Sequence, residues 1–348
     1  MWALDNQTPY AAERAWVRDK NGAEVWIVAV KATYDIRPDG RLELAEEQEE
    51  VCRTAVSRAE PGQSSLLRES DLVRTKASAD VVLNGHAYAP QKKPVEQADV
   101  TMTIAGQSKT LRVFGDRCWD RTLTGVKMSP PEPFLKMPLT YERAYGGFDR
   151  KSENTKKTGW EKRNPIGCSF AMHSQNLIGE AGPNIELPNA AIRSWNHRPA
   201  PAGFGLIARD WSPRVEWAGT YDDAWNNKRR PLVPLDFDDR FFQAAPVDQQ
   251  SPKPLRGGEQ VVLENLTPDG RLEFVLPRVR LGFTTYVAPK TVNHNAQLHT
   301  VIIEADTPQL ILVWHTSLPC HRDCHKLRST RIYEKKVKTQ DPDNGLQP

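Results

Sequence analysis

The chain has 348 residues and a net charge of +3, from 47 basic and 44 acidic side chains. Hydrophobic residues make up 39% and charged residues 26%, which is typical of globular proteins and unlike disordered chains or basic nucleic-acid-binding domains. No apolar run approaches the roughly 18 residues that a membrane-spanning helix needs. The amino terminus lacks the basic and apolar regions of a secretion signal. We therefore expect a cytoplasmic protein with neither stable membrane insertion nor a nucleic-acid partner.

The numbers of cysteines and prolines give further information about the compartment and the secondary structure. The five cysteines are an odd number and are mostly far apart, which predicts free thiols in a reducing compartment. The 27 prolines are about 8% of the chain, against about 5% on average. Long regular helices are therefore not expected across much of the sequence.

The first clear strand is predicted at residues 24–36, which are rich in β-branched and aromatic side chains. A Pro38-Asp39-Gly40 turn follows this strand, and the same three residues return as Pro268-Asp269-Gly270. Proline presets φ and glycine takes the positive-φ position of such turns. The sequence therefore predicts two hairpins with the same turn chemistry.

Further short strands are predicted on both sides of the middle of the chain. In the amino-terminal half they form an expected meander, at residues 79–88, 97–104 and 109–115. In the carboxy-terminal part they lie at residues 259–265, 278–283, 300–304 and 310–315. Short strands separated by turn signals favour a mainly β protein, built as a β-sandwich or as barrel-like sheets.

Regular periodicity fades between the two β regions. The central segment, residues 130–258, is rich in Pro, Gly, Asn, Trp and Tyr, and its aromatic content argues against disorder. We expect an ordered, loop-rich layer with one short helix near residues 222–228, and a linker at residues 248–258. The expected organisation is one domain over residues 1–338, made of regions 1–129, 130–258 and 259–338. Residues 339–348 are expected to form a flexible tail.

The sequence contains none of the common short catalytic motifs, such as a nucleophile elbow, a phosphate-binding loop or a helical zinc motif. The best metal candidate is the Cys320-His321-Arg322-Asp323-Cys324-His325 run, because thiolate and imidazole suit zinc. One segment rarely supplies four tetrahedral ligands at these spacings, so we favour a polar loop end and expect no metal and no cofactor.

Several carboxylates of the central segment are candidates for general acid and base catalysis if the loops bring two of them together. We instead favour turn caps and ion pairs for them. They are Glu142, Asp149, Asp222, Asp223, Asp238 and Asp239.

Aromatic residues and arginine are concentrated in the same segment, and both are enriched at interface hot spots. Internal packing of loops needs the same side chains, so each candidate has that second explanation. The predicted partner-binding residues are Tyr141, Arg143, Tyr145, Phe148, Phe204, Tyr221, Trp225, Arg240 and Phe241.

Several blocks of the chain resemble those of a bacterial domain family that is encoded beside type VI secretion genes. These blocks include residues 141–147, 164–167, 201–205, 219–225 and 238–246. The resemblance implies an adaptor or chaperone that binds a toxic effector, through its apolar or PAAR-linked segment, and helps mount it on the VgrG spike or its PAAR tip. It implies no catalytic residues, so we do not expect an enzyme.

Two other functions remain open from the sequence. A metal-dependent hydrolase would use Cys320, His321, Asp323 and His325. A structural component of the secretion apparatus would instead be incorporated stably into the exported spike.

Overall fold

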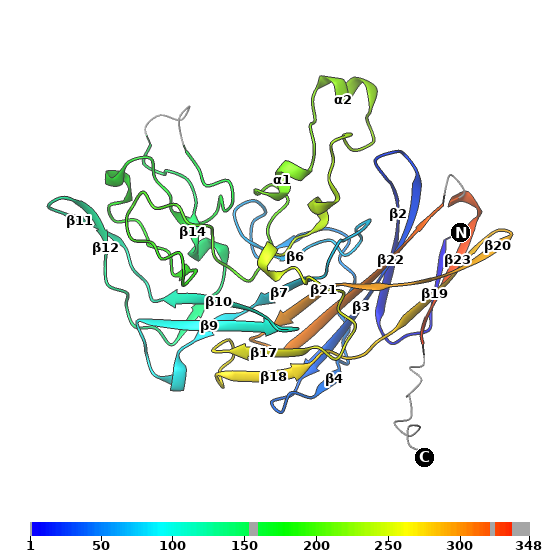
Figure 1. The fold of residues 1–348 in the computed structure, drawn as a ribbon, viewed down its shortest axis with the longest axis horizontal. Helices are drawn as coiled ribbons and strands as arrows, with labels where there is room; N and C mark the ends of the chain where they lie inside the picture. The colour runs from blue at the N-terminus through cyan, green and yellow to red at the C-terminus, as the bar shows by residue number, and fades with distance from the viewer. Residues whose placement is uncertain (1, 153–158, 321–323, 336–348) are drawn as a thin grey trace, which may run out of the picture.

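The longest sheet brings together strands from the two ends of the sequence (Figure 1). The computed structural model describes residues 2–152, 159–320 and 324–335. In spatial order the sheet contains β2 (Ala11–Arg18), β3 (Glu24–Ile36), β22 (Gln309–Pro319), β21 (Gln297–Glu304) and β7 (Asp80–Asn84), and β4 (Leu42–Leu44) pairs with β3. Strand β3 is buried from Val25 to Tyr34, which explains its nearly continuous apolar sequence.

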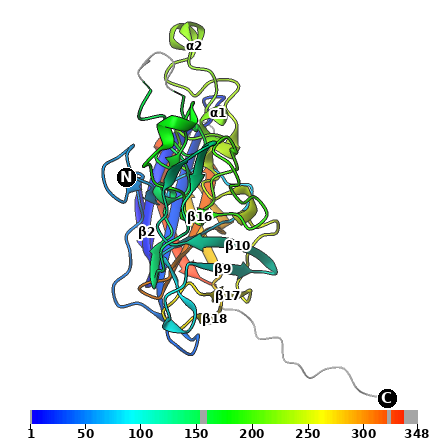
Figure 2. The same cartoon turned by 90° about the vertical axis from the view of Figure 1, so that its left-hand side faces the viewer.

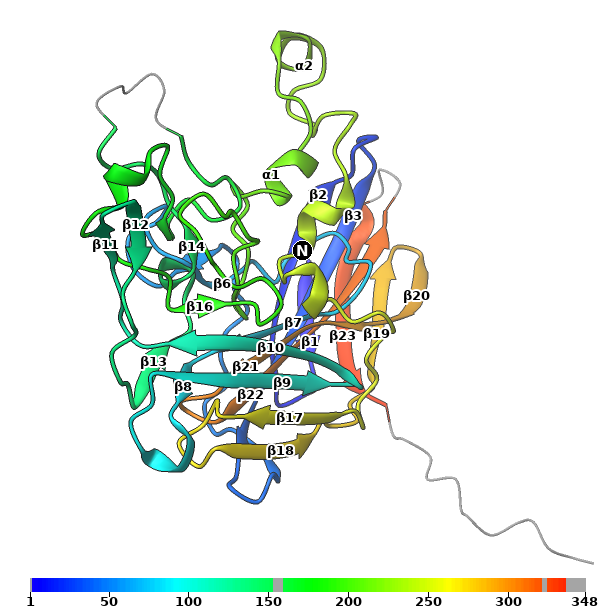
Figure 3. The same ribbon diagram turned by 60° about the vertical axis from the view of Figure 1, so that its left-hand side comes forward.

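A second sheet of five strands lies across the first (Figure 3). Its order is β16 (Ile185–Glu186), β10 (Gln107–Phe114), β9 (Gln97–Ile104), β17 (Gln260–Glu264) and β18 (Arg271–Val275). Buried residues alternate with more exposed ones along β9, so one face of the sheet packs inward. Val100 and Leu263 of this sheet share one hydrophobic core with Val28 and Leu312 of the longest sheet.

A third sheet and four short strand pairs complete the β structure of the described residues. The third sheet contains β1 (Ala3–Asn6), β23 (Leu327–Glu334), β19 (Leu281–Val287) and β20 (Lys290–Asn295). The pairs are β5 (Val56–Ser57) with β6 (Leu66–Arg68), β8 (His86–Tyr88) with β13 (Lys136–Pro138), β11 (Trp119–Thr122) with β12 (Gly125–Met128), and β14 (Tyr145–Gly146) with β15 (Cys168–Ser169).

The mainly β prediction is confirmed, and the sheets stack as sandwich-like layers. None of the sheets in the described ranges closes into a barrel. The expected amino-terminal meander is wrong in one respect, because β7 does not pair with β9. It pairs in parallel with β21, for example Val82 beside Ile302, whereas β9 and β10 form a hairpin that continues into β17. Both larger sheets therefore contain strands from the two β regions.

Both predicted Pro-Asp-Gly turns connect antiparallel strands. The first joins β3 to β4, and the second joins β17 to β18. Gly40 has φ of +81° and Gly270 has φ of +84°, the conformation that glycine adopts without steric cost. The shared turn chemistry is therefore confirmed.

Helical structure is sparse and short. The α-helices are α1 (Arg214–Trp217) and α2 (Asp223–Lys228), and α2 matches the predicted helix. The 3₁₀ turns are η1 (Pro90–Lys92), η2 (Tyr141–Arg143), η4 (Ser174–Leu177), η5 (Asp239–Phe242), η6 (Val247–Gln249) and η7 (Cys324–Lys326). Within the described ranges, no helix has the length and apolar character needed to cross a bilayer.

The expected linker at residues 248–258 is wrong over its first part. Gln249 is buried, and its side-chain amide donates 2.8 Å hydrogen bonds to the carbonyls of Val81 and Phe204. Ser251 is also buried, and its backbone amide donates to Ala79. This stretch therefore ties the central segment to β7.

Candidate partner-binding arm

Residues 218–238, between α1 and η5, form an arm that stands away from the sheets and carries α2 at its tip (Figure 2). The two chain segments at its base hydrogen-bond to each other. The Asp238 amide donates to the Trp217 carbonyl at 3.0 Å, and Asp236 accepts from the Thr220 amide and hydroxyl at 3.0 and 2.7 Å. The arm is therefore an ordered projection.

Helix α2 begins where the sequence provides a cap. The Asp222 side chain accepts a 2.8 Å hydrogen bond from the Trp225 amide, as expected for an N-terminal capping residue. The Trp225 indole donates to the Leu232 carbonyl at 2.7 Å, and its ring meets the Tyr221 ring edge-on at 4.7 Å between centroids. These contacts fold the tip back on itself.

The tip also contacts the turn between β2 and β3. The Arg229 guanidinium donates to the carbonyl of Lys20 in that turn and to the Val233 carbonyl at 2.7 Å. The Leu232 side chain lies beside Gly22 of the same turn. Contacts at the tip and at the base together fix the direction of the arm.

At the base of the arm, Arg214 is buried and joins three segments. Its guanidinium donates to Glu69 at 2.8 Å, to the Ile207 carbonyl at 2.6 Å and to the Phe241 carbonyl at 3.0 Å. Arg209 donates to the other Glu69 oxygen at 2.8 Å. Burial alone would raise the pKa of Glu69, but Arg214 and Arg209 lower it below its ordinary value. Glu69 is therefore an ionised anchor for this base.

The arm leaves large apolar side chains in solvent. Tyr221 is 54% exposed and Leu235 is 71% exposed. At the base of the arm, a cavity of about 160 Å³ is lined mainly by apolar side chains, including Trp217, and Val247 at its wall is 70% exposed. Rigidly presented aromatic and aliphatic groups beside a small apolar cavity are features that protein partners use.

The predicted partner-binding residues do not form a single surface. Tyr141, Tyr145 and Phe204 are buried, and Tyr141 packs edge-on against Trp211 with 5.4 Å between ring centroids. In this structure their side chains form part of the interior and do not form a surface that a partner could contact. Arg143 is half-buried and donates to Asp116 and Asn184 at 2.9 and 3.0 Å.

Four of the predicted residues belong to the arm or its base. Tyr221 and Trp225 lie on the arm, and Arg240 and Phe241 lie in η5 at its base. The Arg240 guanidinium sits 5.0 Å from the ring centroid of Trp217. Phe241 is partly buried, with Arg214 over its ring at 5.3 Å. The prediction of partner contact stays open for these four residues.

Phe148 lies in a different exposed region. It pairs with Trp160 through an isolated β-bridge, and Phe148, Trp160 and Met172 are each more than two-fifths exposed. The aromatic content of the sequence could not distinguish this region from the arm. The sequence prediction also did not include the exposed Leu235 and Val247, because neither lies in a recognisable motif.

The favoured turn caps and ion pairs are formed by Asp149, Asp222, Asp238 and Asp239, but not, within the described residues, by Glu142 or Asp223. Glu142 accepts from the Ser65 amide and hydroxyl, and the buried Asp149 accepts from the Met172 amide and the Asn176 side chain. Asp222 caps α2, and Asp238 caps η5 and pairs with Arg240, while Asp239 pairs with Arg74. Asp223 lies in the first turn of α2, where a negative charge is favourable.

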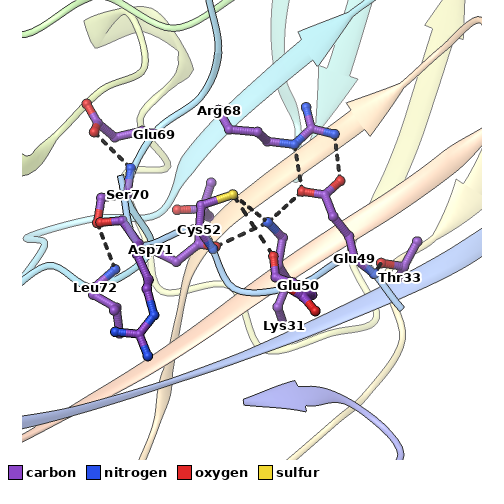
Figure 4. A network of polar contacts seen from close by, with 12 residues as sticks. Lys31, Thr33, Glu49, Glu50, Cys52, Arg68, Glu69, Ser70, Asp71 and Leu72 are labelled. Carbon is purple, nitrogen blue, oxygen red and sulfur yellow. Dashed lines mark hydrogen bonds and ion pairs between the residues drawn. The ribbon is translucent and has the colours of Figure 1, made fainter. Parts of the chain in front are cut away.

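Sequence reasoning missed a buried polar network around Lys31 (Figure 4). The Lys31 ammonium lies 2.6 Å from Glu49, 3.1 Å from Asp71 and 3.3 Å from the Cys52 sulfur. Burial would raise the pKa of Glu49, but Arg68 and Lys31 lower it to about 2. The sequence feature that could have indicated this network is Lys31, a lysine in the middle of the otherwise apolar strand at residues 24–36.

Within the network, the positive charge of Lys31 is neutralised by the neighbouring carboxylates of Glu49 and Asp71. Burial and the neighbouring Asp71 raise the pKa of the Cys52 thiol above its ordinary value, which is the opposite of an activated nucleophile. These contacts therefore hold β3 and the segment that follows β4 together electrostatically.

The candidate metal run lies only partly within the described residues. His321, Arg322 and Asp323 fall outside them. Cys320 and Cys324 are buried and form no disulfide. The described residues contain no cluster of three or more potential metal ligands.

Residues 21–315 match the model of a family described as an uncharacterized protein conserved in bacteria, DUF2169. The chain belongs to this family. No curated protein and no solved structure matches the chain. The DUF2169 match includes the whole arm and most strands of the two larger sheets, and the family description assigns no activity.

Proposed function

We propose that this DUF2169 protein is a non-catalytic adaptor or chaperone of a type VI secretion effector. In this proposal it binds the effector in the cytoplasm and helps load it onto VgrG or its PAAR tip. The resemblance in the central sequence blocks supports this role, and two of the blocks, residues 219–225 and 238–246, contribute to the arm or its base. The observation that carries the proposal is the anchored arm with exposed Tyr221 and Leu235.

The physical role of the arm follows from its exposed surface. An effector segment with an apolar helix or strand would aggregate unless it were covered. Tyr221 and Leu235 would contact that segment, and the small cavity at the base could receive one of its side chains. Because Arg214 and Arg229 already fix the arm, binding would cost little ordering entropy.

The test is co-purification of the tagged protein from a native-like lysate, with mass spectrometry of the bound proteins. Wild-type protein should recover a toxin-bearing effector, with or without VgrG. Tyr221→Ala combined with Leu235→Ala should reduce recovery at least about tenfold, since hot-spot truncations cost about 2 kcal/mol or more. The control is Leu123→Ala with Tyr286→Ala, which removes two exposed side chains elsewhere.

Circular dichroism should show native folding in both double variants. Equal recovery of the effector by the arm variant and the wild type would contradict the role of the arm. Stable incorporation of the protein into exported spikes would instead favour a structural component. Recovery of no partner, together with stoichiometric zinc, would favour the hydrolase.

A further inference from the structure

A second cavity, of about 580 Å³, has no lining residue in common with the arm or with the cavity at its base. It opens where the third sheet meets the longest sheet, around the connection between β20 and β21. Segments 76–79 before β7, 254–257 before β17 and 277–281 at the start of β19 complete its wall. Its volume falls within the range of small-molecule sites, about 300–1,000 Å³.

The charged residues that line this cavity are all basic. Lys76, Arg256, Arg280 and Lys335 line it, and none of the described lining residues is Asp or Glu. This bias is local, because the whole chain has a net charge of only +3. A low-dielectric recess lined by cations attracts and concentrates anions.

Most of these cations are not neutralised by the protein. Lys76 is compensated, since its ammonium lies 2.6 Å from the buried Asp80. Lys335 donates to the neutral side chain of Asn295. Arg256 and Arg280 make no ion pair with any residue in the described ranges. Arg256, Arg280 and Lys335 therefore line the cavity as exposed cations whose side chains have no carboxylate partner among the described residues.

His299 supplies a polar group inside the same cavity. His299 is only 6% exposed, and its Nδ1 atom has no hydrogen-bond partner among the described residues. Its ring lies beside that of His315, with 4.6 Å between centroids. Burial, followed by the nearby His315 and Lys76, lowers the pKa of His299 to about 2. A buried, neutral imidazole without a partner costs free energy unless something satisfies it.

The remaining wall is mainly apolar, although Ser78, Asn295 and Gln297 also line it. The buried core residues that border the cavity are Leu255, Leu281, Leu298 and Trp314, and the half-buried Val279 packs beside them. A ligand that fits this lining needs an apolar body as well as a negative charge. We propose that the cavity binds a small organic anion that carries a carboxylate or phosphate group on an apolar body. This site is independent of the effector-binding arm.

In the bound state, Arg256 and Arg280 would contact the anionic group, because guanidinium groups pair with carboxylate and phosphate through two parallel hydrogen bonds. The apolar body would lie against Leu298 and Trp314. The protein would thereby distinguish the anion from an uncharged molecule of the same shape.

Isothermal titration calorimetry of the full chain with three aromatic probes tests this assignment. Phenyl phosphate and benzoate carry the two candidate anions, and benzyl alcohol is their uncharged counterpart. At least one anion should bind saturably and more tightly than benzyl alcohol. Its affinity should fall at least tenfold in Arg256→Gln combined with Arg280→Gln, and it should weaken as salt is raised.

The control is Arg121→Gln combined with Lys127→Gln, which lowers the net charge equally at exposed positions on β11 and β12. It should bind the anion like the wild type. A preference for phenyl phosphate or for benzoate would identify the anionic group. The proposal would be overturned if neither anion bound, if benzyl alcohol bound equally well, or if both double variants lost affinity to the same extent.

Discussion

Arg214 and Glu69 are 145 positions apart in the sequence, yet their side chains meet at 2.8 Å in the interior. Neither is more than 7% exposed. The pair links α1 at the base of the arm to the segment that follows β6. Loss of this contact should therefore disturb both the buried core and the base of the arm.

Replacing Glu69 by Leu should destabilise the protein by about 3–5 kcal/mol, because Arg214 would remain charged and buried without its partner. Urea denaturation of the purified variant measures this free energy of unfolding. The matched control is Glu43→Gln, which removes the exposed pairing with Arg37 and should leave the unfolding midpoint nearly unchanged. Equal midpoints for the two variants would show that the Arg214 anchor contributes little.

Gly40→Ala should destabilise the protein much more than Gly62→Ala. Both glycines have positive φ, +81° and +77°, so the backbone cost of adding a side chain is similar. An added Cβ at Gly40 would lie 2.0 Å from the Glu273 carbonyl oxygen, whereas nothing lies within 4 Å at Gly62. Thermal unfolding of the two variants isolates this contact between the two Pro-Asp-Gly hairpins. Equal losses would show that the turn conformation alone accounts for the effect.

Local signals in the sequence predicted elements well where neighbouring residues determine them. Strand β9 matches the predicted 97–104 range, and α2 matches the predicted helix with Asp222 as its cap. The partner of β7 could not be predicted in this way, because β21 lies more than 200 positions away. A strand's own alternation shows which face is buried but does not identify its neighbour.

The candidate site was predicted less well, for a related physical reason. Phe204 and Tyr221 both stand out as aromatic residues in glycine-rich loops, but the first is fully buried and the second is 54% exposed. An aromatic side chain packs a loop or binds a partner through the same burial of apolar area. Leu235 and the cationic cavity gave no local pattern, since tertiary contacts alone bring their surroundings together.

The free energy of unfolding should fall as the pH decreases from about 6.5 toward about 5. Burial lowers the pKa of His294 and His315 to about 4 and that of His299 to about 2. The unfolded chain, with histidine pKa values near 6.5, therefore binds protons in this range that the folded chain does not. Each pKa unit corresponds to about 1.4 kcal/mol, so each of the three imidazoles contributes a loss of about 1.6 kcal/mol by pH 5, and the total expected loss is about 5 kcal/mol.

Urea titrations at several pH values measure this loss. His299→Gln should reduce the slope of stability against pH, whereas His197→Gln, at an exposed position, should not. A flat profile between pH 7 and 5 would contradict the neutral, buried state of these imidazoles. Lowered carboxyl pKa values, such as that of Glu49 at about 2, act in the same direction but only below about pH 4.5.

Asp222→Ala should loosen the tip of the arm without unfolding the protein. The Asp222 carboxylate accepts from the Trp225 amide at 2.8 Å, and removing a capping side chain costs about 1 kcal/mol. Hydrogen exchange at the Trp225 amide should therefore accelerate about fivefold, while the global unfolding midpoint stays unchanged. Asp223→Ala is the matched control, because Asp223 lies in the first turn of α2 and does not cap it. Equal exchange rates in the two variants would mean that the Trp225–Leu232 hydrogen bond and the Arg229 contacts, rather than the cap, hold the tip.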